Sequence, residues 1–427
     1  MDKIKVIGGN KLFGEIAISG AKNAALPILA ASLLTASPVS ISNIPDLHDI
    51  KSMASLLQHH GAEISFTGFS NETGSQSRTV TVHAQNITNF TAPYDIVRKM
   101  RASFLVIGPL LARFGQATVS LPGGCAIGTR PINLHLEVLE KMGATAEVDN
   151  GYINAYIKGR LKGTEIIFNT VSVGATETAM MAASLADGVT TIKNAAKEPE
   201  IIDLAKFLNE MGGKIEGAGS DTITITGVTE LHSAKHTLIA DRIEAGTYAI
   251  ATAITGGKVK INHVNPEIIS SVLYNLENIG IQIGREADSF TVSRSDKILP
   301  TKISTAPYPS FPTDMQAQFM ALLCLADGVS HIEETIWENR FMHVAELNRM
   351  GANIITNHNM AIINGISGFR GAEVMATDLR ASVSLVIAAL VATGETLIHR
   401  VYHLDRGYDH LEAKLKACGA QIERVAA

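Results

Sequence analysis

A short phrase recurs six times along the 427-residue chain. Each copy is an apolar helical stretch that ends in Gly followed by a small or apolar residue. The six glycines are Gly61, Gly143, Gly212, Gly280, Gly351 and Gly419, which lie 82, 69, 68, 71 and 68 residues apart. A spacing repeated this often indicates that one supersecondary unit has been copied six times.

Each predicted unit contains the same elements in the same order. An Ala-rich helix comes first, a turn with Gly or Pro leads into a short strand, and a second helix ends at the repeated Gly, which is expected to adopt the left-handed conformation that stops helices. One or two further strands close the unit. His59 and His60 precede the first repeated Gly and are expected on a solvated face. We predict the six first helices at residues 22–36, 101–113, 174–186, 241–255, 314–326 and 379–393.

Six such units can be arranged in two ways. Two pseudo-symmetric α/β domains of three units each fit a chain of this length. A linear solenoid is the competing arrangement, because repeats often stack end to end. Periodicity does not distinguish them. Residues 67–79 are rich in Ser, Thr, Asn and Gly and lengthen the first interval, so we expect an exposed loop there.

Composition narrows the class of protein. Apolar residues make up 46% of the chain and charged residues 18%, and this charged share is below the roughly 25% of ordinary soluble domains. The net charge is −5, which speaks against nucleic-acid binding. The three cysteines are far apart, so neither a disulfide framework nor a zinc site is expected. With no signal peptide and no apolar run near the ~18 residues of a membrane span, we predict a cytoplasmic protein without a membrane partner.

Polar residues collect at two places in the repeated unit, the start of the first helix and the turn before the second. Helix N-termini favour anions, and Lys or Arg beside them adds charge-assisted hydrogen bonds. For Ser172, Thr313 and Thr377, helix capping and ligand binding remain equally plausible. Capping explains little for Lys22 or the neighbouring arginines, because a cation opposes the helix dipole. Salt bridges to nearby carboxylates are the alternative for these cations.

Two further segments contain candidate catalytic groups. Residues 121–131 (LPGGCAIGTRP) place Cys125 near Arg130 and a helix start at Pro131, a setting that lowers a thiol pKa and favours reactivity. Cys324 and Cys418 lie in apolar helical patterns and are predicted to be core residues. Asp314 follows two prolines at a helix start, where it is either a cap or a general base among cations.

Six long segments match one family. They are residues 19–27 (SGAKNAALP), 121–131 (LPGGCAIGTRP), 172–177 (SVGATE), 311–316 (FPTDMQ), 338–342 (ENRFM) and 377–381 (TDLRA). On these motifs the chain resembles the UDP-N-acetylglucosamine 1-carboxyvinyltransferases, a family of enolpyruvyl transferases, and the match runs from end to end.

The resemblance implies a fold and a domain division. The fold would be α/β, with two inside-out α/β barrel domains of three units each and the active site in the cleft between them. Residues 22–239 would form the N-terminal domain, which carries the catalytic loop 121–131. Residues 1–21 would join residues 240–427 in the C-terminal domain.

The resemblance also implies a reaction. The enolpyruvyl group of phosphoenolpyruvate would pass to the 3-hydroxyl of UDP-N-acetylglucosamine through a tetrahedral adduct that then loses phosphate, as the first committed step of peptidoglycan precursor synthesis. Cys125 would protonate the substrate and Asp314 would take the hydroxyl proton. Lys22, Arg130 and Arg406 would contact phosphoenolpyruvate, with Arg340 and Arg380 close by. No metal or organic cofactor is implied, and a monomer is expected. The nucleotide-sugar contacts would be Asn23, Arg101, Arg130, Pro131, Ile132, Asn133, Leu134, Ser172, Val173, Gly174, Asp314 and Ile336.

Two departures and two alternatives accompany this reading. Asn133 stands where the family usually has Asp, and Thr170 stands near a position that is Lys in some relatives; both departures bear on nucleotide contact. One alternative is 5-enolpyruvylshikimate-3-phosphate synthase, but its Leu-Pro-Gly-Ser-Lys-Ser signature is absent. The other is a non-catalytic nucleotide-sugar-binding paralogue. Retention of Lys22 and Cys125 together with Asp314 and Arg406 speaks against it.

Overall fold

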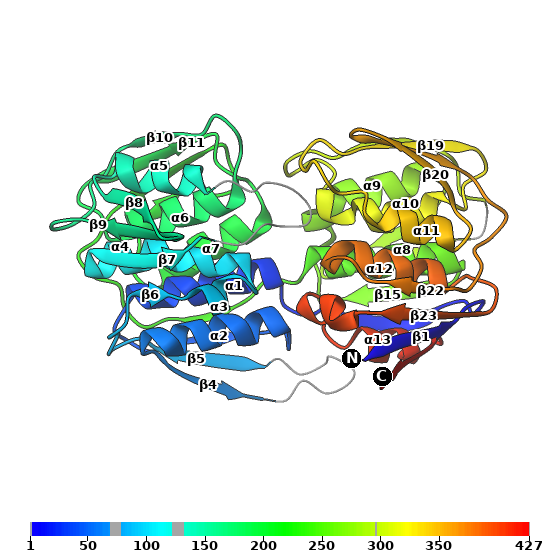
Figure 1. Cartoon of the computed structure of the whole chain (residues 1–427), viewed down its shortest axis with the longest axis horizontal. Coiled ribbons are helices and arrows are strands. Elements are labelled where there is room, and N and C mark those ends of the chain that lie inside the picture. Colours follow the sequence, from blue (N-terminus) through cyan, green and yellow to red (C-terminus); the bar gives the residue numbers. More distant parts are fainter. Residues whose placement is uncertain (1, 69–77, 122–131, 295–296, 427) are drawn as a thin grey trace.

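The structure is a computed structural model that describes residues 2–68, 78–121, 132–294 and 297–426. Its helices and strands form two lobes of the same design (Figure 1). One hydrophobic core runs through residues 21–238. A second core combines residues 4–18 with residues 243–422. The chain is therefore not a linear solenoid, because each set of three units surrounds a core of its own.

The described strands form six four-stranded sheets, three in each lobe. In the first lobe the orders are β14 (Lys235–Thr237), β3 (Val39–Ser42), β5 (Thr79–His83), β4 (Glu63–Thr67); β6 (Thr91–Ala92), β7 (Gln116–Ser120), β9 (Tyr152–Tyr156), β8 (Thr145–Asp149); and β10 (Glu165–Ile167), β11 (Val189–Lys193), β13 (Thr222–Thr226), β12 (Ile215–Glu216). In the second lobe they are β16 (Gln282–Arg285), β17 (Ser289–Ser293), β15 (Lys258–Asn262), β2 (Phe13–Ala17); β18 (Lys302–Ser304), β19 (Val329–Glu333), β21 (Met360–Asn364), β20 (Asn353–Asn357); and β22 (Glu373–Met375), β23 (Glu395–His399), β1 (Lys3–Ile7), β24 (Gln421–Val425).

All six sheets share one hydrogen-bonding pattern. A short edge strand pairs in parallel with its neighbour, and the remaining pairs are antiparallel. Along the strands buried and less buried residues alternate, as in the pattern of β11 and β15. One face of each sheet therefore packs inward, while the other faces solvent.

The first helix of each unit lies at the centre of its lobe. These helices are α1 (Lys22–Ala31), α4 (Ile107–Phe114), α6 (Val173–Ser184), α8 (Arg242–Thr255), α10 (Gln316–Leu323) and α12 (Leu379–Ala389). All 14 residues of α8 are buried. A helix that protein surrounds on all sides is expected to carry mainly apolar residues around its whole circumference. Helices inside and sheets outside confirm the predicted inside-out α/β fold.

The second helices end where the sequence predicts. They are α2 (His48–His60), α5 (Asn133–Lys141), α7 (Pro199–Glu210), α9 (Ser270–Asn278), α11 (His343–Arg349) and α13 (Leu411–Ala417). The six repeated glycines have φ between 94° and 110°, which confirms the left-handed stop. The solvated position expected for His60 is wrong. Its ring is buried and Nδ1 lies 2.7 Å from the Asn89 carbonyl oxygen, because the backbone of residues 88 and 89 folds over the last turn of α2.

The chain passes between the lobes twice. We call residues 18–22 the first crossing and residues 238–242 the second crossing. Before the first crossing, β1 and β2 belong to sheets of the second lobe, and before the second crossing β14 belongs to a sheet of the first lobe. Both termini therefore lie in the second lobe, side by side (Figure 1). We propose on this basis the domain division expected above, with residues 22–239 in one domain and residues 1–21 and 240–427 in the other.

The two crossings bind each other where they meet. Gly20 and Ala240 form an antiparallel bridge, Ala21 N donates to Ile239 O at 2.8 Å, and Asp241 N donates to Ser19 O at 2.9 Å. A Cβ on Gly20 would lie 1.8 Å from the Asn43 carbonyl oxygen. Glycine is needed at this point because the backbones approach too closely for any side chain.

Candidate active site

Two carboxylates each form ion pairs with two of the cationic side chains that the sequence predicts for the site. The first is Asp49, which is buried in the first turn of α2. It accepts a hydrogen bond from Lys22 Nζ at 3.2 Å and another from Arg406 Nε at 2.9 Å. Lys22 begins α1 in the first lobe, while Arg406 ends the 3-10 helical turn Val401–Arg406 in the second lobe. Asp49 therefore joins cations from both lobes.

Burial and charge compete at this cluster. Burial lowers the pKa of the Lys22 ammonium below its usual 10.5, against the opposing effect of Asp49. Burial also works to raise the pKa of Asp49, but Lys22 and Arg406 outweigh it and hold that pKa below the usual 3.8. Asp49 is therefore ionised at neutral pH. One carboxylate between two cationic side chains leaves positive charge available for an anionic ligand.

The second carboxylate is Asp314, in the 3-10 helical turn Thr313–Met315 that precedes α10. Arg340 Nη2 donates to Asp314 Oδ1 at 2.6 Å, and Arg380 Nε lies 3.6 Å from Oδ2. Both guanidinium groups are buried. Asp314 is thus a carboxylate among cations, and the residue at the N-cap position of its turn is Pro312. The Arg380 pKa is raised above its usual value, because Tyr408 and Asp314 outweigh the effect of burial.

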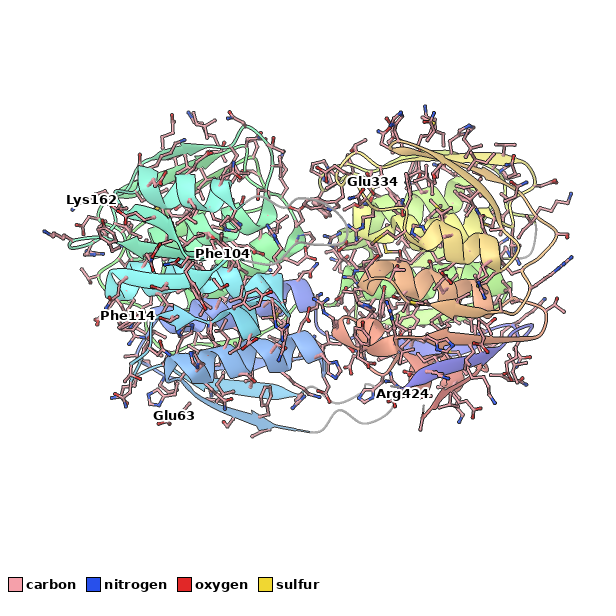
Figure 2. The ribbon with its side chains drawn as sticks, viewed as in Figure 1. Glu63, Phe104, Phe114, Lys162, Glu334 and Arg424 are labelled. Carbon is pink, nitrogen blue, oxygen red and sulfur yellow. The ribbon has the colours of Figure 1, made fainter. Side chains whose placement is uncertain are left out.

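Glu334 supports the segment around Asp314, and the sequence reasoning missed it. Its carboxylate accepts hydrogen bonds from Thr305 Oγ1 at 2.9 Å, Thr313 Oγ1 at 2.8 Å and Ile336 N at 2.9 Å. Thr313, left open above between capping and binding, therefore binds a carboxylate instead of capping. Figure 2 labels Glu334 in the second lobe. A single buried carboxylate thus fixes Ile336 relative to Asp314.

A neutral histidine packs against the start of α6 in the first lobe. Ser172 is the N-cap of α6 and accepts from Ala175 N at 3.3 Å, so capping is confirmed for this residue. His135 Nδ1 lies 2.8 Å from Thr178 Oγ1. A Cβ on Gly174 would lie 3.0 Å from the His135 ring. Burial, with Arg101 adding to it, lowers the pKa of His135 to about 4, so the ring is neutral at physiological pH.

A second ion pair joins the lobes, and both of its side chains are buried. Arg242, the first residue of α8, donates from Nε to the two carboxylate oxygens of Glu200 at 3.0 and 3.2 Å. Glu200 lies in the first turn of α7. Glu200 is an ordinary acidic residue in a first helical turn, whereas Arg242 opposes the dipole of α8. Nothing local in the sequence links the two residues, which lie 42 positions apart.

The structure does not reach every predicted site residue. Cys125, Arg130 and Pro131 lie outside the described residues. Asn23 follows Lys22 in α1, and Ile132 to Leu134 form the start of α5. Asn133 is exposed there. At the start of α12 the N-cap is Asp378 rather than Thr377.

The other two cysteines are core residues, as predicted. Cys324 and Cys418 are 0% and 2% exposed. Burial raises the pKa of the Cys324 thiol to about 12 and that of the Cys418 thiol to about 11. Neither thiol is therefore a nucleophile or an acid near neutral pH.

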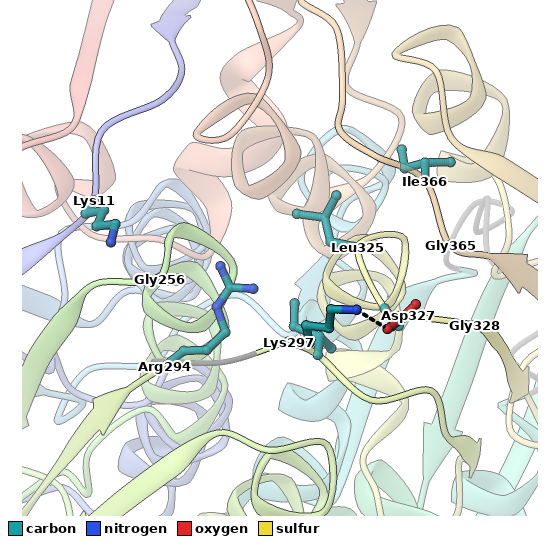
Figure 3. Close-up of a pocket in the computed structure, with 11 residues that line it drawn as sticks. Lys11, Gly256, Arg294, Lys297, Leu325, Asp327, Gly328, Gly365 and Ile366 are labelled. Carbon is teal, nitrogen blue, oxygen red and sulfur yellow. Dashed lines mark hydrogen bonds and ion pairs between the residues drawn. The ribbon is translucent and has the colours of Figure 1, made fainter.

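A surface hollow of about 730 Å³ lies elsewhere in the second lobe. It is lined by residues past the C-terminal ends of α8 and α10, whereas Asp314, Arg242 and Glu244 stand at or near the N-terminal ends of those helices. Lys297 pairs with Asp327 at 2.6 Å, as Figure 3 shows. Arg294 donates to the Ile254 carbonyl at 3.2 Å. None of the predicted site residues that the structure describes lines this hollow, so it is not the candidate site.

Within residues 2–68, 78–121, 132–294 and 297–426 no group of His, Cys, Asp and Glu side chains is arranged to hold a metal ion. None of the helices in those same ranges has the length and apolar character needed to cross a membrane.

Comparison with known proteins places this arrangement in a family. The family described as EPSP synthase (3-phosphoshikimate 1-carboxyvinyltransferase) matches residues 6–415. A UDP-N-acetylglucosamine 1-carboxyvinyltransferase of Agrobacterium fabrum is 56% identical over 428 residues, and one of Idiomarina loihiensis is 53% identical over 427 residues; both matches cover all of each chain. The chain belongs to the UDP-N-acetylglucosamine 1-carboxyvinyltransferase family.

Solved structures agree with membership of this family. The enolpyruvyl transferase NikO of Streptomyces tendae superimposes with a TM-score of 0.88 at 26% identity, over 100% of this chain and 99% of that one. An EPSP synthase of Acinetobacter baumannii gives a TM-score of 0.76 at 18% identity over both full chains, which supports the fold alone. The family predicted from the motifs is confirmed.

Proposed function

We propose that the protein transfers the enolpyruvyl group of phosphoenolpyruvate to the 3-hydroxyl of UDP-N-acetylglucosamine and releases inorganic phosphate. This is the first committed step of peptidoglycan precursor synthesis. The observation that carries the proposal is the identity of 53–56% with UDP-N-acetylglucosamine 1-carboxyvinyltransferases along the entire chain. The cationic clusters around Asp49 and Asp314 are consistent with a substrate that carries a phosphate and a carboxylate.

The reaction is an addition followed by an elimination. The sugar hydroxyl oxygen forms a bond to C2 of the enolpyruvyl group, its proton leaves to a base, and C3 gains a proton from an acid. The resulting adduct loses inorganic phosphate, and C3 gives up a proton as the double bond returns. Fixed cations stabilise the anionic adduct without reorganising. Holding both substrates together removes much of the entropic barrier.

Specific residues fit these steps. Asp314 is the proposed base for the hydroxyl proton, and it lies beside Arg340 and Arg380. Cys125 is the proposed acid for C3. Lys22 and Arg406, whose head groups share Asp49, are proposed to bind phosphoenolpyruvate together with Arg130. The proposed contacts to the nucleotide sugar are Asn23, Arg101, Arg130, Pro131, Ile132, Asn133, Leu134, Ser172, Val173, Gly174, Asp314 and Ile336.

The decisive experiment measures phosphate release from phosphoenolpyruvate with either of two acceptors. UDP-N-acetylglucosamine is expected to support release, and shikimate 3-phosphate is the competing acceptor because the matching family model is named for that reaction. Release with shikimate 3-phosphate but not with UDP-N-acetylglucosamine would overturn the proposed acceptor. Binding of the nucleotide sugar without any release would indicate a non-catalytic paralogue.

The role of Cys125 is tested separately from the reaction. Cys125→Ala is expected to abolish turnover near neutral pH while the affinity for UDP-N-acetylglucosamine, measured by calorimetry, stays nearly unchanged. Cys125→Asp retains an acid and is expected to retain activity. The epoxide fosfomycin is expected to add its mass to the wild-type chain and not to Cys125→Ala. Equal loss of binding and turnover in Cys125→Ala would make the residue structural.

The setting of the protein is also proposed. We infer that it acts in the cytoplasm as a monomer, that it takes part in cell-wall growth and thus in cell division, and that it needs no cofactor, metal, nucleic acid or membrane. Size-exclusion chromatography with light scattering tests the monomer, and activity after treatment with a metal chelator tests the absence of a metal requirement.

A further inference from the structure

A buried polar network lies directly beneath the first crossing. Lys414 Nζ donates to Glu244 Oε1 at 2.7 Å and to Ser19 Oγ at 2.8 Å. Ser19 N donates to Glu244 Oε2 at 2.8 Å, and Ser19 Oγ donates to Asp409 Oδ2 at 3.1 Å. The side chains of Lys414 and Glu244 are only 1% and 2% exposed. The network therefore combines a fully buried ion pair with the backbone of the first crossing.

The six-fold repeat shows that a lysine at this position is unusual. Lys414 lies five residues before the repeated Gly419 on the second helix of its unit. At the same distance before their own repeated glycines, the three units of the first lobe carry Leu56, Val138 and Phe207, all of them buried. The other two units of the second lobe carry Asn275 and Glu346, which are only partly buried. Lys414 is therefore the only buried charged side chain among the six. Burying an ion pair costs several kcal/mol per ion before the attraction is regained. An apolar residue would fill this position at lower cost if packing were its only role.

Glu244 departs from the repeat in the same way. It stands three residues after the N-cap of α8, where α1, α6 and α12 carry the buried alanines Ala24, Ala175 and Ala381. A Glu at this position often reaches back to the amide of its own N-cap residue. Here the Asp241 amide donates to Ser19 O instead, and Glu244 binds the Ser19 amide. The carboxylate therefore stabilises the crossing and not its own helix.

The network also lies between the segments that carry two proposed substrate cations. Ser19 stands three residues before Lys22, and Asp409 stands three residues after Arg406. The Lys22 amide donates to Asp241 Oδ2 at 3.3 Å. With the bond from the Ser19 amide to Glu244, this makes two hydrogen bonds between the first crossing and the N-terminal end of α8. Helix α1 has no side-chain cap at its N-terminus. The position of Lys22 therefore depends on how the first crossing is held.

We propose that Lys414 is a positioning residue for enolpyruvyl transfer: through Glu244, Ser19 and Asp409 it fixes the backbone on both sides of the Asp49 cluster and so sets the separation of Lys22 from Arg406. The inference rests on the proposed function. Within the described residues, no hydrogen bond or ion pair joins Lys414 to Lys22 or to Arg406. Its effect is carried by the backbone and by Ser19.

The test uses two variants and a matched control in the full-length enzyme. Lys414→Met combined with Glu244→Gln removes the ion pair without leaving a lone charge at either position. Ser19→Ala keeps the ion pair but removes the hydroxyl that joins Lys414 to Asp409. The control is His236→Gln, which removes a similarly buried partner of a carboxylate beside the second crossing. Folding of every protein is checked by circular dichroism and thermal melting.

The expected result is a selective loss for one substrate. In the double variant we expect the KM for phosphoenolpyruvate to rise about tenfold or more, because small displacements of binding groups weaken catalysis strongly. The KM for the nucleotide sugar should change several times less, since half of its twelve proposed contacts lie at the starts of α5 and α6, away from the first crossing. Ser19→Ala should show the same selectivity at smaller size. His236→Gln should lower the melting temperature and leave both KM values unchanged.

Each outcome decides between the two proposals. If the wild type is active and the folded variants keep the wild-type KM values for both substrates, Lys414 is only structural. That result would overturn the inference and leave the proposed function intact. An equal rise of the phosphoenolpyruvate KM in the His236→Gln control would also overturn it, because the effect would not be specific to the first crossing. Absence of wild-type phosphate release would overturn the proposed function and the inference with it.

Discussion

The two crossings perform the same task with different chemistry. The first crossing is held by Glu244, whose carboxylate binds the Ser19 amide and is paired with a lysine, Lys414. The second crossing is held by Asp203, whose carboxylate accepts from the Ile239 amide at 3.3 Å and lies 3.2 Å from His236 Nε2. In both places a buried carboxylate binds backbone, and a basic side chain balances the carboxylate.

The difference lies in the basic side chain of each pair, which is a histidine only at the second crossing. Histidine changes charge in the physiological range. Burial lowers the pKa of His236, but Asp203 and Glu210 outweigh it, so the net pKa lies above the usual 6.5. The second crossing can therefore loosen with alkaline pH. The first crossing is held instead by the pair of Lys414 and Glu244, in which burial raises the pKa of the Glu244 carboxylate above its usual 4.5.

The largest effect that sharpens this comparison is expected from Lys414→Met alone. It leaves Glu244 buried without its cation, so the free energy of unfolding should fall by about 3–5 kcal/mol. Urea denaturation followed by circular dichroism measures the loss. Lys297→Met removes an exposed ion pair in the same lobe and should leave stability nearly unchanged. Similar small losses for both would mean that the buried pair contributes no more than a surface pair.

The next largest effect on stability is expected at Gly20, one of the two residues at which the crossings meet, and not at its bridge partner Ala240. Gly20→Ala places a Cβ 1.8 Å from the Asn43 carbonyl oxygen, so it should destabilise the fold by about 3 kcal/mol or more, the upper range for overpacking. Its bridge partner has room for a side chain, and Ala240→Gly should cost no more than about 1 kcal/mol. Denaturation midpoints of the two variants give the comparison. Equal losses would contradict the proposed crowding at Gly20.

A pH-dependent effect is expected at the second crossing. Because the folded pKa of His236 is raised, protonated His236 stabilises the fold fully below about pH 6.5. This stabilisation is lost as the pH rises through the folded pKa. The wild type should therefore exceed His236→Gln in stability by more at pH 6 than at pH 9. Thermal melts across this range test the sign, and a constant difference between the two proteins would contradict it.

The smallest effect concerns a buried carboxylate that belongs to neither crossing. Burial, with Glu200 and Glu198 adding to it, raises the pKa of Glu177 well above the usual 4.5. The neutral acid is favoured in the folded state, so stability is lost as the pH rises towards the folded pKa. Glu177→Gln removes that loss and should be more stable than the wild type at pH 8 but not at pH 4. An unchanged difference between these pH values would show that folding does not shift the pKa of Glu177.

The sequence predicted those features that depend on local and repeated signals. Six units, their central helices and the left-handed glycines follow from patterns that each unit repeats, and all are confirmed. The sequence did not reveal Asp49, Glu334 or the pair of Glu244 with Lys414. Their partners lie far away in the chain, and each residue alone looks like an ordinary helix-end or helix-surface charge. The roles assigned to Cys125 and the rest of its loop remain predictions.

The interleaved course of the chain has a consequence for its synthesis. The first lobe needs residues 21–238 for its core, so it can be completed while the second half is still being translated. The earliest strand, β1, instead lies between β23 and β24, and its partners begin only at residue 395. Closing a loop of this length is slow and costs chain entropy. The first residues to leave the ribosome are therefore among the last to find their partners, and until then β1 is an unpaired strand that can pair with other chains.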